Sequence, residues 1–373
     1  MKKPFEIGNR SAMKREIGKL KEATQDYSEI IHIYRALEMK YIITVFVLLL
    51  AASTIPLTVA QPDYVPYPTQ LSWSPDAAYV AISGYGFLQV SDVNTGAVLI
   101  DLQDDKRDFR SHDWSADSKR LAVADGLGLR IWDVRDGALL FETATNTREF
   151  GIVSVVEWSS AGTTLLTLHQ FPQAVILVWD AQTYEIIDTV QFGYADQMML
   201  NPDGEHVALS YGGFGVSIYH LETPNDPIFR IEDDYPTSAY AWSGDGSHIA
   251  LGYRDGRIVI WDVATQQKVR TLQTNTAASF LDLVWDPDNE RIATVRNGFR
   301  VQIWNIETGE LLYESEPYSS SSIDFSPDGG QLAGSGLTLS IERASTEDKA
   351  IFEDDARMWQ LFPTSDDEDA DHD

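Results

Sequence analysis

The sequence predicts an all-β chain in which one unit is repeated seven times across residues 71–354. In each copy a large apolar residue stands before a turn, as in Leu71-Ser-Trp-Ser-Pro-Asp76. These residues are 40 to 44 positions apart: Trp73, Trp114, Trp158, Leu200, Trp242, Trp285 and Phe325. A second landmark recurs in phase, in Ile131-Trp-Asp133, Val178-Trp-Asp180, Ile260-Trp-Asp262 and Ile303-Trp-Asn305. Two markers in step, at a period of about 40–45 residues, indicate a seven-bladed β-propeller of four-stranded antiparallel blades.

The fifth unit shows how one copy is expected to fold. Its apolar segment 239–242 leads into the turn Ser243-Gly-Asp-Gly246, and three more short segments rich in β-branched residues follow, separated by turns. Such residues favour strands, whereas Asp and Gly favour tight turns. One four-stranded sheet cannot bury both of its faces, so neighbouring units must stack in a ring. The expected blades lie near residues 71–102, 112–143, 155–190, 197–231, 239–272, 282–315 and 322–354.

With these landmarks the chain resembles the WD-repeat family of β-propellers, over about three quarters of its length. The Trp-Asp dipeptide is replaced in the first, fourth and seventh units by Ser91-Asp92, Tyr219-His220 and Ile341-Glu342. The family's Gly-His dipeptide is missing, and its turn aspartate is matched well only by Asp255. The resemblance therefore implies that the family's hydrogen-bonded tetrad is largely absent and that apolar packing joins the blades. It assigns structural landmark roles to Trp73, Trp114, Trp132, Trp158, Trp179, Trp242, Trp261, Trp285, Trp304 and Phe325.

A hydrophobic segment precedes the repeats. Read from Met39, residues 39–60 resemble a secretory signal peptide with a cleavage site before Gln61. Read from Met1, residues 41–60 form a signal anchor of about 20 residues, with the amino terminus in the cytoplasm. Both interpretations export the propeller, as a secreted or membrane-anchored protein of bacterial type. They leave open where translation starts and whether the segment is cleaved.

Residues 1–38 have two interpretations. Within 11–38, apolar residues recur at helical spacing, which predicts a helix that could pair as a short cytoplasmic coiled coil: Met13, Ile17, Leu20, Tyr27, Ile31 and Tyr34. The alternative is a start codon assigned too early, with the true start at Met39.

The segments that flank the repeats are candidates to close the ring. An open ring would expose strand edges and two apolar blade faces. Residues 61–70 are expected to be a linker or a closing strand, and residues 355–364 a closing segment that buries Trp359 and Phe362. Residues 365–373 are a block of like charges and are expected to be a disordered acidic tail.

The charge of the chain restricts its partners. With 57 acidic and 28 basic residues the net charge is −29, which repels nucleic-acid phosphates, so no nucleic-acid partner is expected. The chain contains no cysteine, which excludes disulfides, thiolate metal sites and a lipid-bearing cysteine. A monomeric propeller is expected.

No catalytic motif is recognisable, so we expect neither enzyme activity nor a cofactor. The seven histidines are scattered, with no pair at metal-ligand spacing on one element. Phosphate-binding loops, nucleophile elbows and dinucleotide fingerprints are missing. Asp286-Pro-Asp-Asn-Glu290 could hold calcium but matches no complete loop of oxygen ligands, and whether calcium is bound stays open.

Binding is therefore the expected function. Propellers of this family gather on one face the loops between second and third strands and those between blades. Here these loops carry the candidate partner-binding residues Tyr85, Phe109, Arg110, Phe171, Tyr194, Tyr211, Phe214, Tyr235, Tyr253, Arg254, Arg296, Phe299 and Tyr318. Aromatic residues and Arg dominate binding hot spots. Loops that differ from blade to blade favour one asymmetric protein or peptide partner and thus a scaffold, with a cell-surface glycan- or polymer-binding propeller as the alternative.

Overall fold

The computed structural model describes residues 68–143, 151–170, 173–211, 215–274, 279–296, 300–315, 321–334, 337–341 and 352–354. These residues contain strands and turns but no helix, which confirms the all-β prediction. All of them belong to Val65–Asp373, the second of the two compact units of the chain. The predictions for residues 11–38, 41–60, 355–364 and 365–373 lie outside the described residues. Within the described ranges no helix is long and apolar enough to cross a membrane.

The strands form antiparallel sheets, six with four strands and one with three. The three-stranded sheet contains β1 (Pro68–Trp73), β2 (Tyr79–Asp92) and β3 (Val98–Asp108). Each of the others uses four strands that follow one another in the chain. They are β4 (Ser111–Trp114), β5 (Arg120–Ala124), β6 (Leu129–Asp133) and β7 (Leu139–Thr143); β8 (Ile152–Trp158), β9 (Thr164–Gln170), β10 (Ala174–Asp180) and β11 (Ile186–Phe192); β12 (Gln197–Leu200), β13 (His206–Ser210), β14 (Val216–His220) and β15 (Phe229–Ile231); β16 (Thr237–Trp242), β17 (His248–Tyr253), β18 (Arg257–Asp262) and β19 (Gln267–Gln273); β20 (Phe280–Trp285), β21 (Arg291–Arg296), β22 (Arg300–Asn305) and β23 (Leu311–Glu314); and β24 (Ile323–Phe325), β25 (Gln331–Gly334), β26 (Leu337–Ile341) and β27 (Phe352–Asp354).

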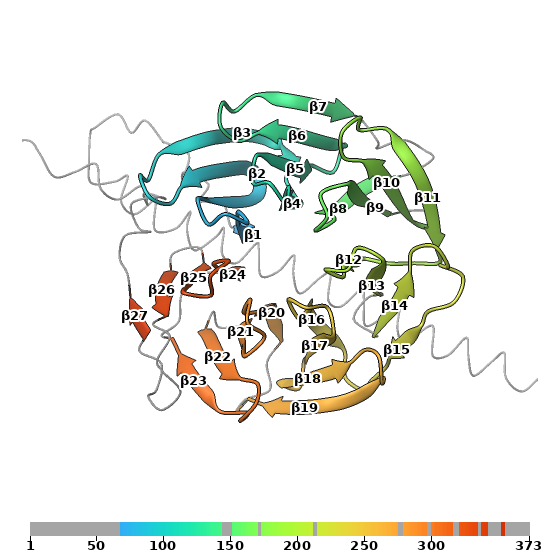
Figure 1. Ribbon diagram of the computed structural model, residues 1–373, viewed down its shortest axis with the longest axis vertical. Helices are drawn as coiled ribbons and strands as arrows, with labels where there is room; N and C mark the ends of the chain where they lie inside the picture. Colours follow the sequence, from blue (N-terminus) through green and yellow to red (C-terminus); the bar gives the residue numbers. More distant parts are fainter. Residues whose placement is uncertain are drawn as a thin grey trace, which may run out of the picture. The chain divides into compact units, whose positions relative to one another are not determined.

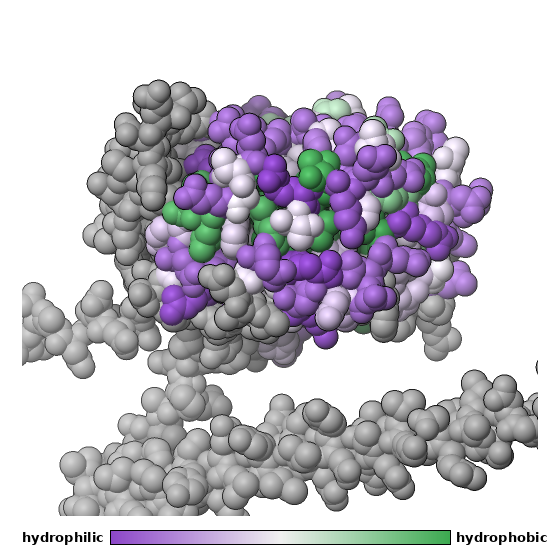
Figure 2. Space-filling model, turned by 90° about the horizontal axis from the view of Figure 1, so that it is seen from below, coloured by the Kyte–Doolittle hydropathy of each residue, from purple (hydrophilic) through white to green (hydrophobic). Residues whose placement is uncertain are grey.

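The sheets are arranged in a ring, with the first strand of each sheet at the centre and the last at the rim (Figure 1). This is a β-propeller with four-stranded antiparallel blades. On the side of the ring that carries β19 and β23, apolar residues occupy the middle of the rim and hydrophilic residues its borders (Figure 2).

The repeated landmarks occupy equivalent places in the sheets. Every turn-preceding residue ends an innermost strand, as Trp73 ends β1 and Trp114 ends β4. The Trp of the second landmark lies on the third strand: in one sheet Trp114 pairs with Leu121, Leu121 with Trp132, and Trp132 with Leu139. The two landmarks therefore mark the first and the third strand of a sheet.

Strand β2 of the three-stranded sheet folds back on itself. Its beginning pairs with β1, Trp73 opposite Val80, and its end pairs with β3, Ser91 opposite Val98. The Val93 N–H donates to the Ala78 carbonyl at 2.9 Å, so the two ends of β2 lie side by side. The reversal falls near Gly86, whose φ of 84° suits glycine.

The apolar cores lie between neighbouring sheets. Ile131 of β6, for example, packs with Trp158 of β8 and Trp179 of β10. The last interface closes the ring, because Ala333 of β25 packs in one cluster with Leu71 and Trp73 of β1. Burial of each large apolar side chain contributes about 1.5–3 kcal/mol. Of the two expected closing segments, only residues 68–70 are described, and they begin the innermost strand of the first sheet.

Candidate functional site

One face of the ring collects the turns between second and third strands and the loops between sheets, because the strands alternate in direction. We refer to it as the loop face. Five of the candidate residues are exposed there: Tyr85, Arg110, Tyr194, Tyr235 and Arg254. The three tyrosines have about half of their surface exposed, at 50%, 50% and 51% for Tyr85, Tyr194 and Tyr235.

Three other candidates are buried and cannot touch a partner in this conformation. Phe109 and Tyr253 are each 1% exposed, and Arg296 is 7% exposed. Phe109 belongs to the apolar core beside Trp114, and Tyr253 to the core beside Trp242. Tyr211 is half-buried, and its hydroxyl lies 3.3 Å from that of Tyr219. The remaining candidates lie outside the described residues: Phe171, Phe214, Phe299 and Tyr318.

Tyr235 is held in place by a cluster around Arg257. The guanidinium carbon of Arg257 lies 5.4 Å from the Tyr235 ring centre and 4.9 Å from that of Tyr253. Asp233 accepts a bond from Arg257 Nη2 at 2.8 Å, and Asp255 accepts one from Nε at 2.5 Å. The hydrogen bond to Asp233 is the main cause that raises the pKa of Arg257 further above its ordinary value. An exposed tyrosine fixed in this way loses little rotamer freedom on binding.

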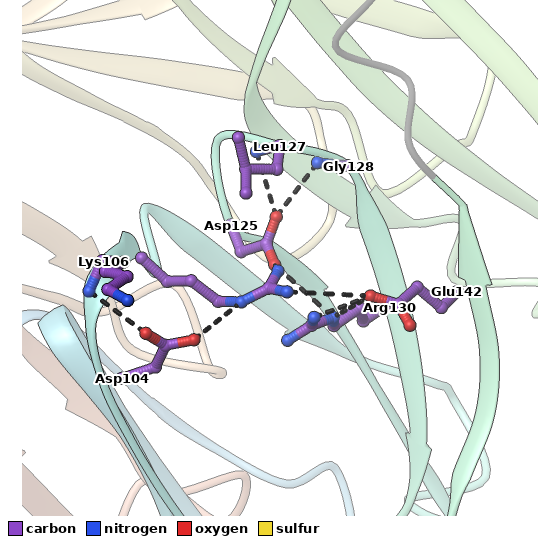
Figure 3. A network of polar contacts seen from close by, with 8 residues as sticks. Asp104, Lys106, Asp125, Leu127, Gly128, Arg130 and Glu142 are labelled. Atoms are coloured by element: carbon purple, nitrogen blue, oxygen red, sulfur yellow. Dashed lines mark hydrogen bonds and ion pairs between the residues drawn. The ribbon is translucent and has the colours of Figure 1, made fainter.

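A second polar network supports the loops beside Arg110 (Figure 3). The buried Asp125 carboxylate accepts the backbone N–H groups of Leu127 and Gly128, both at 3.0 Å, which fixes the turn between β5 and β6. The same carboxylate pairs with Arg107, which arrives from β3 of the neighbouring sheet. Arg130 joins the network by donating to Glu142 at 2.6 Å. Asp125 is not among the residues predicted from the sequence, although it directly precedes Gly126 in the way that Asp255 precedes Gly256.

The first strands of four sheets line a cavity of about 870 Å³ at the centre of the ring. Two acidic residues on its wall are Asp113 of β4 and Glu157 of β8. Asp113 Oδ2 accepts the Trp158 N–H at 2.6 Å, and its Oδ1 accepts the Trp114 N–H at 2.9 Å. Glu157 accepts the backbone N–H of Leu200, in the next sheet. These carboxylates therefore satisfy backbone donors at the free inner edges of strands.

The surroundings of these carboxylates disfavour their charged form. Burial raises the pKa of Asp113 to about 7. Burial also raises the pKa of Glu157 well above its usual range, and the nearby Asp113 adds to the effect. Because both oxygens of Asp113 are engaged with backbone N–H groups, the arrangement suits structural linkage between blades better than proton transfer to a substrate.

The landmark tryptophans differ in their polar partners. Trp179 Nε1 donates to Thr167 Oγ1 at 2.9 Å, and that hydroxyl also contacts His169 Nε2 at 2.9 Å. The indole nitrogens of Trp132, Trp261 and Trp304 are buried without a hydrogen-bond partner. Within the described ranges, no three His, Asp or Glu side chains form a group that could hold a metal ion.

Comparison with known proteins agrees with the fold. The family description "WD domain, G-beta repeat" matches residues 232–262, which include β16, β17 and β18. The ring of sheets makes the protein a β-propeller, and the sheet that contains residues 232–262 is similar to a WD-type repeat.

Several curated proteins are similar to parts of the chain. A subunit of chromatin assembly factor 1 from Gallus gallus is 27% identical over 171 residues, 46% of this chain and 26% of the relative. The coronin-like protein of Saccharomyces cerevisiae is 29% identical over 36% of this chain and 22% of its own length. A subunit of eukaryotic translation initiation factor 3 from Candida glabrata is 31% identical over 28% of this chain and 30% of its own length. The chain thus matches about a quarter of these relatives. They are eukaryotic and do not support the expectation of a bacterial type.

Proposed function

We propose that this protein is a non-catalytic interaction scaffold whose loop face binds a protein or peptide partner. The observation that carries the proposal is the set of three half-exposed tyrosines on the loop face: Tyr85 in the first sheet, and Tyr194 and Tyr235 in two loops between sheets. Tyrosine buries a large area at low entropic cost and is common at the centre of interfaces. The cluster around Arg257 gives one of the three a fixed position.

The relatives support a binding role through what their names describe. Two of the three compared above are named as a subunit of an assembly factor and a subunit of an initiation factor. A further relative from Drosophila melanogaster, 28% identical over 39% of this chain, is named actin-interacting protein 1. Since the chain covers only part of each relative, the partner of this protein does not follow from their names.

We also propose that the ring has seven blades. The three-stranded sheet counts as a complete blade if β2 supplies its second and third strands. Two features support this. The first is the hydrogen bond from the Val93 N–H to the Ala78 carbonyl, which lies at the same place in its sheet as the 2.9 Å bond from Val134 to Lys119 in the next sheet. The pairs Trp73–Val80 and Ser91–Val98 also repeat the register of Trp114–Leu121 and Trp132–Leu139.

We further propose that the propeller acts outside the cytoplasm, on the strength of the hydrophobic segment 41–60 alone. If Met39 is the true start and the segment is cleaved, sequencing the mature amino terminus should give a first residue near Gln61. An intact protein in the membrane fraction whose propeller resists external protease would contradict export.

The partner proposal is tested with the full chain as bait and a substitution set on each face. Replacement of Tyr85, Tyr194 and Tyr235 by serine should reduce retention of the partner about tenfold or more. The matched control replaces Arg135, Gln182 and Glu307, exposed residues in turns on the opposite face, by alanine and should retain the partner. Equal retention by both sets would refute the proposed face. Binding to a glycan array that depends on the same tyrosines would favour the polymer-binding alternative.

A further inference from the structure

The outermost strand β11 presents an apolar free edge. It is the last strand in the order β11-β10-β9-β8, so no described strand pairs with its outer side. Its first four side chains are exposed, and two of them are isoleucines: Ile186 is 43% exposed and Ile187 is 58% exposed. Exposed strand edges of this kind are templates for pairing with another chain.

The equivalent position differs between sheets, because it is apolar in β7, where Leu139 is 42% exposed, and in β11, but holds a lysine in β19. Ile186 pairs opposite Trp179, just as Lys268 of β19 pairs opposite Trp261. The Lys268 ammonium lies 5.0 Å from the centre of the Trp261 ring and so covers it with a charged group. Lysine on an edge strand discourages pairing with a further strand. β11 has an isoleucine where β19 has this protection.

The apolar surface continues from β11 to its neighbour. The Phe141 ring of β7 lies 5.0 Å from that of Tyr184, two positions before Ile186, and 6.3 Å from that of Trp179. Arg120 Nη1 donates to the Ala181 carbonyl at 2.6 Å and contacts the Tyr184 hydroxyl at 3.3 Å, which fixes this turn. β7 and β11 are adjacent along the rim (Figure 1). We refer to Leu140, Phe141, Tyr184, Ile186 and Ile187 as the β7–β11 ridge.

The charges around the β7–β11 ridge are mainly acidic. Neither β7 nor β11 contains Lys or Arg, whereas β19 carries Lys268 and Arg270. Glu185 and Asp188 are exposed on and beside β11. The whole chain has a net charge of −29. A partner that approaches this edge therefore gains from positive charge, and one with negative charge is repelled.

We infer that the β7–β11 ridge binds an extended, basic segment of a protein partner, which adds to β11 as a fifth strand. Main-chain hydrogen bonds to the free edge supply affinity, apolar side chains of the segment cover Ile186 and Ile187, and its Lys or Arg residues face Glu185 and Asp188. A second copy of this chain fits less well, because pairing two β11 strands would bring the same acidic side chains of both copies together.

The inference is tested with full-length protein and labelled peptides of about eight residues, the length of a strand. One peptide alternates Lys and Val, one alternates Glu and Val, and one is the Lys–Val peptide with a central Pro. Fluorescence anisotropy should show binding of the first only, weakened by salt. Hydrogen exchange should show added protection at residues 186–192 and none at 267–273. Ile186→Lys, which copies Lys268, should weaken binding about tenfold or more, equivalent to 1.4 kcal/mol.

Leu311→Lys on β23 is the matched control. Leu311 pairs opposite Trp304 in the same way as Ile186 pairs opposite Trp179, but it is less exposed and lies on a shorter strand. This variant should leave binding unchanged. Equal binding of the acidic or Pro-containing peptide would overturn the inference, as would equal losses for the two lysine variants. Concentration-dependent dimerisation that Ile186→Lys abolishes would show that a second copy occupies the edge instead.

Discussion

The backbone N–H of Trp73 donates to Asp324 Oδ2 at 2.9 Å, although the two residues are 251 positions apart. The Trp73 indole nitrogen donates in turn to the Asp324 carbonyl at 3.1 Å. Trp73 ends the innermost strand of the first sheet, and Asp324 lies in β24 of the last. These two bonds, with the apolar contacts beside them, join the ends of the repeat array.

The same kind of bond joins other neighbouring sheets. Trp242 Nε1 donates to the Met199 carbonyl and Trp285 Nε1 to the Ala241 carbonyl, both at 3.1 Å. Two units lack this indole because they carry Leu200 and Phe325. At those junctions a carboxylate accepts a backbone N–H: Glu157 from Leu200, and Asp282 from Ile323 at 3.0 Å. Because Trp73 and Trp158 also donate their backbone N–H groups to a carboxylate of a neighbouring sheet, this bond joins sheets whether or not an indole is present.

The first prediction concerns Asp324. Asp324→Ala removes the acceptor of the Trp73 N–H and should lower the free energy of unfolding by about 2–3 kcal/mol, because a buried donor is left unsatisfied. Asp324→Asn keeps an acceptor oxygen and should change it by less than about 1 kcal/mol. Urea unfolding measures both. The control is Asp234→Ala at an exposed position, and a loss there as large as that of Asp324→Ala would contradict the closing role.

The sequence predicted the repeat well because each landmark residue takes the same place in the strand order of its sheet. The partners of these landmarks were harder to predict because they lie in the next unit, as Asp113 and Trp158 do. The sequence does contain a signal for these partners, since an acidic residue directly precedes Trp114, Trp158 and Phe325. The loop-face residues were predicted less well: Phe109 and Tyr253 face inward, and a loop sequence without a regular period does not indicate side-chain direction.

The second prediction concerns the close approach of Gly252 to Phe280. A Cβ at Gly252 would lie 2.6 Å from Phe280 Cδ2, and Phe280 is only 2% exposed. Gly252→Ala should therefore lower the free energy of unfolding by about 1–3 kcal/mol through overpacking. Gly193→Ala is the control, because nothing lies within 4 Å of its added Cβ. Thermal unfolding compares the two, and equal stabilities would show that Phe280 moves aside freely.

The third prediction concerns the carboxyl-terminal residues. Removal of residues 365–373 should leave the melting temperature unchanged, since this charged tail offers little surface to bury. A chain that ends at residue 351 loses β27, which pairs with β26 through Leu339–Asp354 and Ile341–Phe352. Its melting temperature should fall by several degrees. A chain that ends at residue 354 keeps β27 and lacks the expected closing segment 355–364. Stability like that of the intact chain would rule out a closing role for this segment.

The fourth prediction concerns pH and rests on two opposing sets of buried groups. Burial raises the pKa of Asp113 and of Asp324 to about 7, and burial also raises that of Asp282 and, well above its usual range, that of Glu157. Burial lowers the pKa of His112 to about 3 and that of His169 to about 4. His112 is fixed as a neutral ring, with Nδ1 2.8 Å from Ser83 Oγ and Nε2 2.9 Å from Ser72 Oγ.

The two sets give slopes of opposite sign. Between about pH 4 and 7 the folded protein holds protons on these carboxyls that the unfolded chain has released, so they reduce stability as pH rises. Between about pH 3 and 6.5 the two histidines bind protons in the unfolded chain but not in the folded protein. These histidines therefore make the protein more stable as the pH rises. Above pH 6.5 only the carboxyls still titrate. Stability should therefore fall by about 1–2 kcal/mol between pH 6.5 and 8.

Urea unfolding at high ionic strength, which screens the surface charge, measures this slope. The triple variant Asp113→Asn/Glu157→Gln/Asp324→Asn cannot ionise at these positions and should lose most of the decline between pH 6.5 and 8. In His112→Gln the new side chain can still contact Ser72 and Ser83 but cannot bind a proton. This variant should reduce the rise of stability with pH below pH 6.5 and leave the decline above pH 6.5 unchanged. If the triple variant retains the full decline, the carboxylates of the inner strands are not the source of the pH dependence. The surface charge of the chain is then its source.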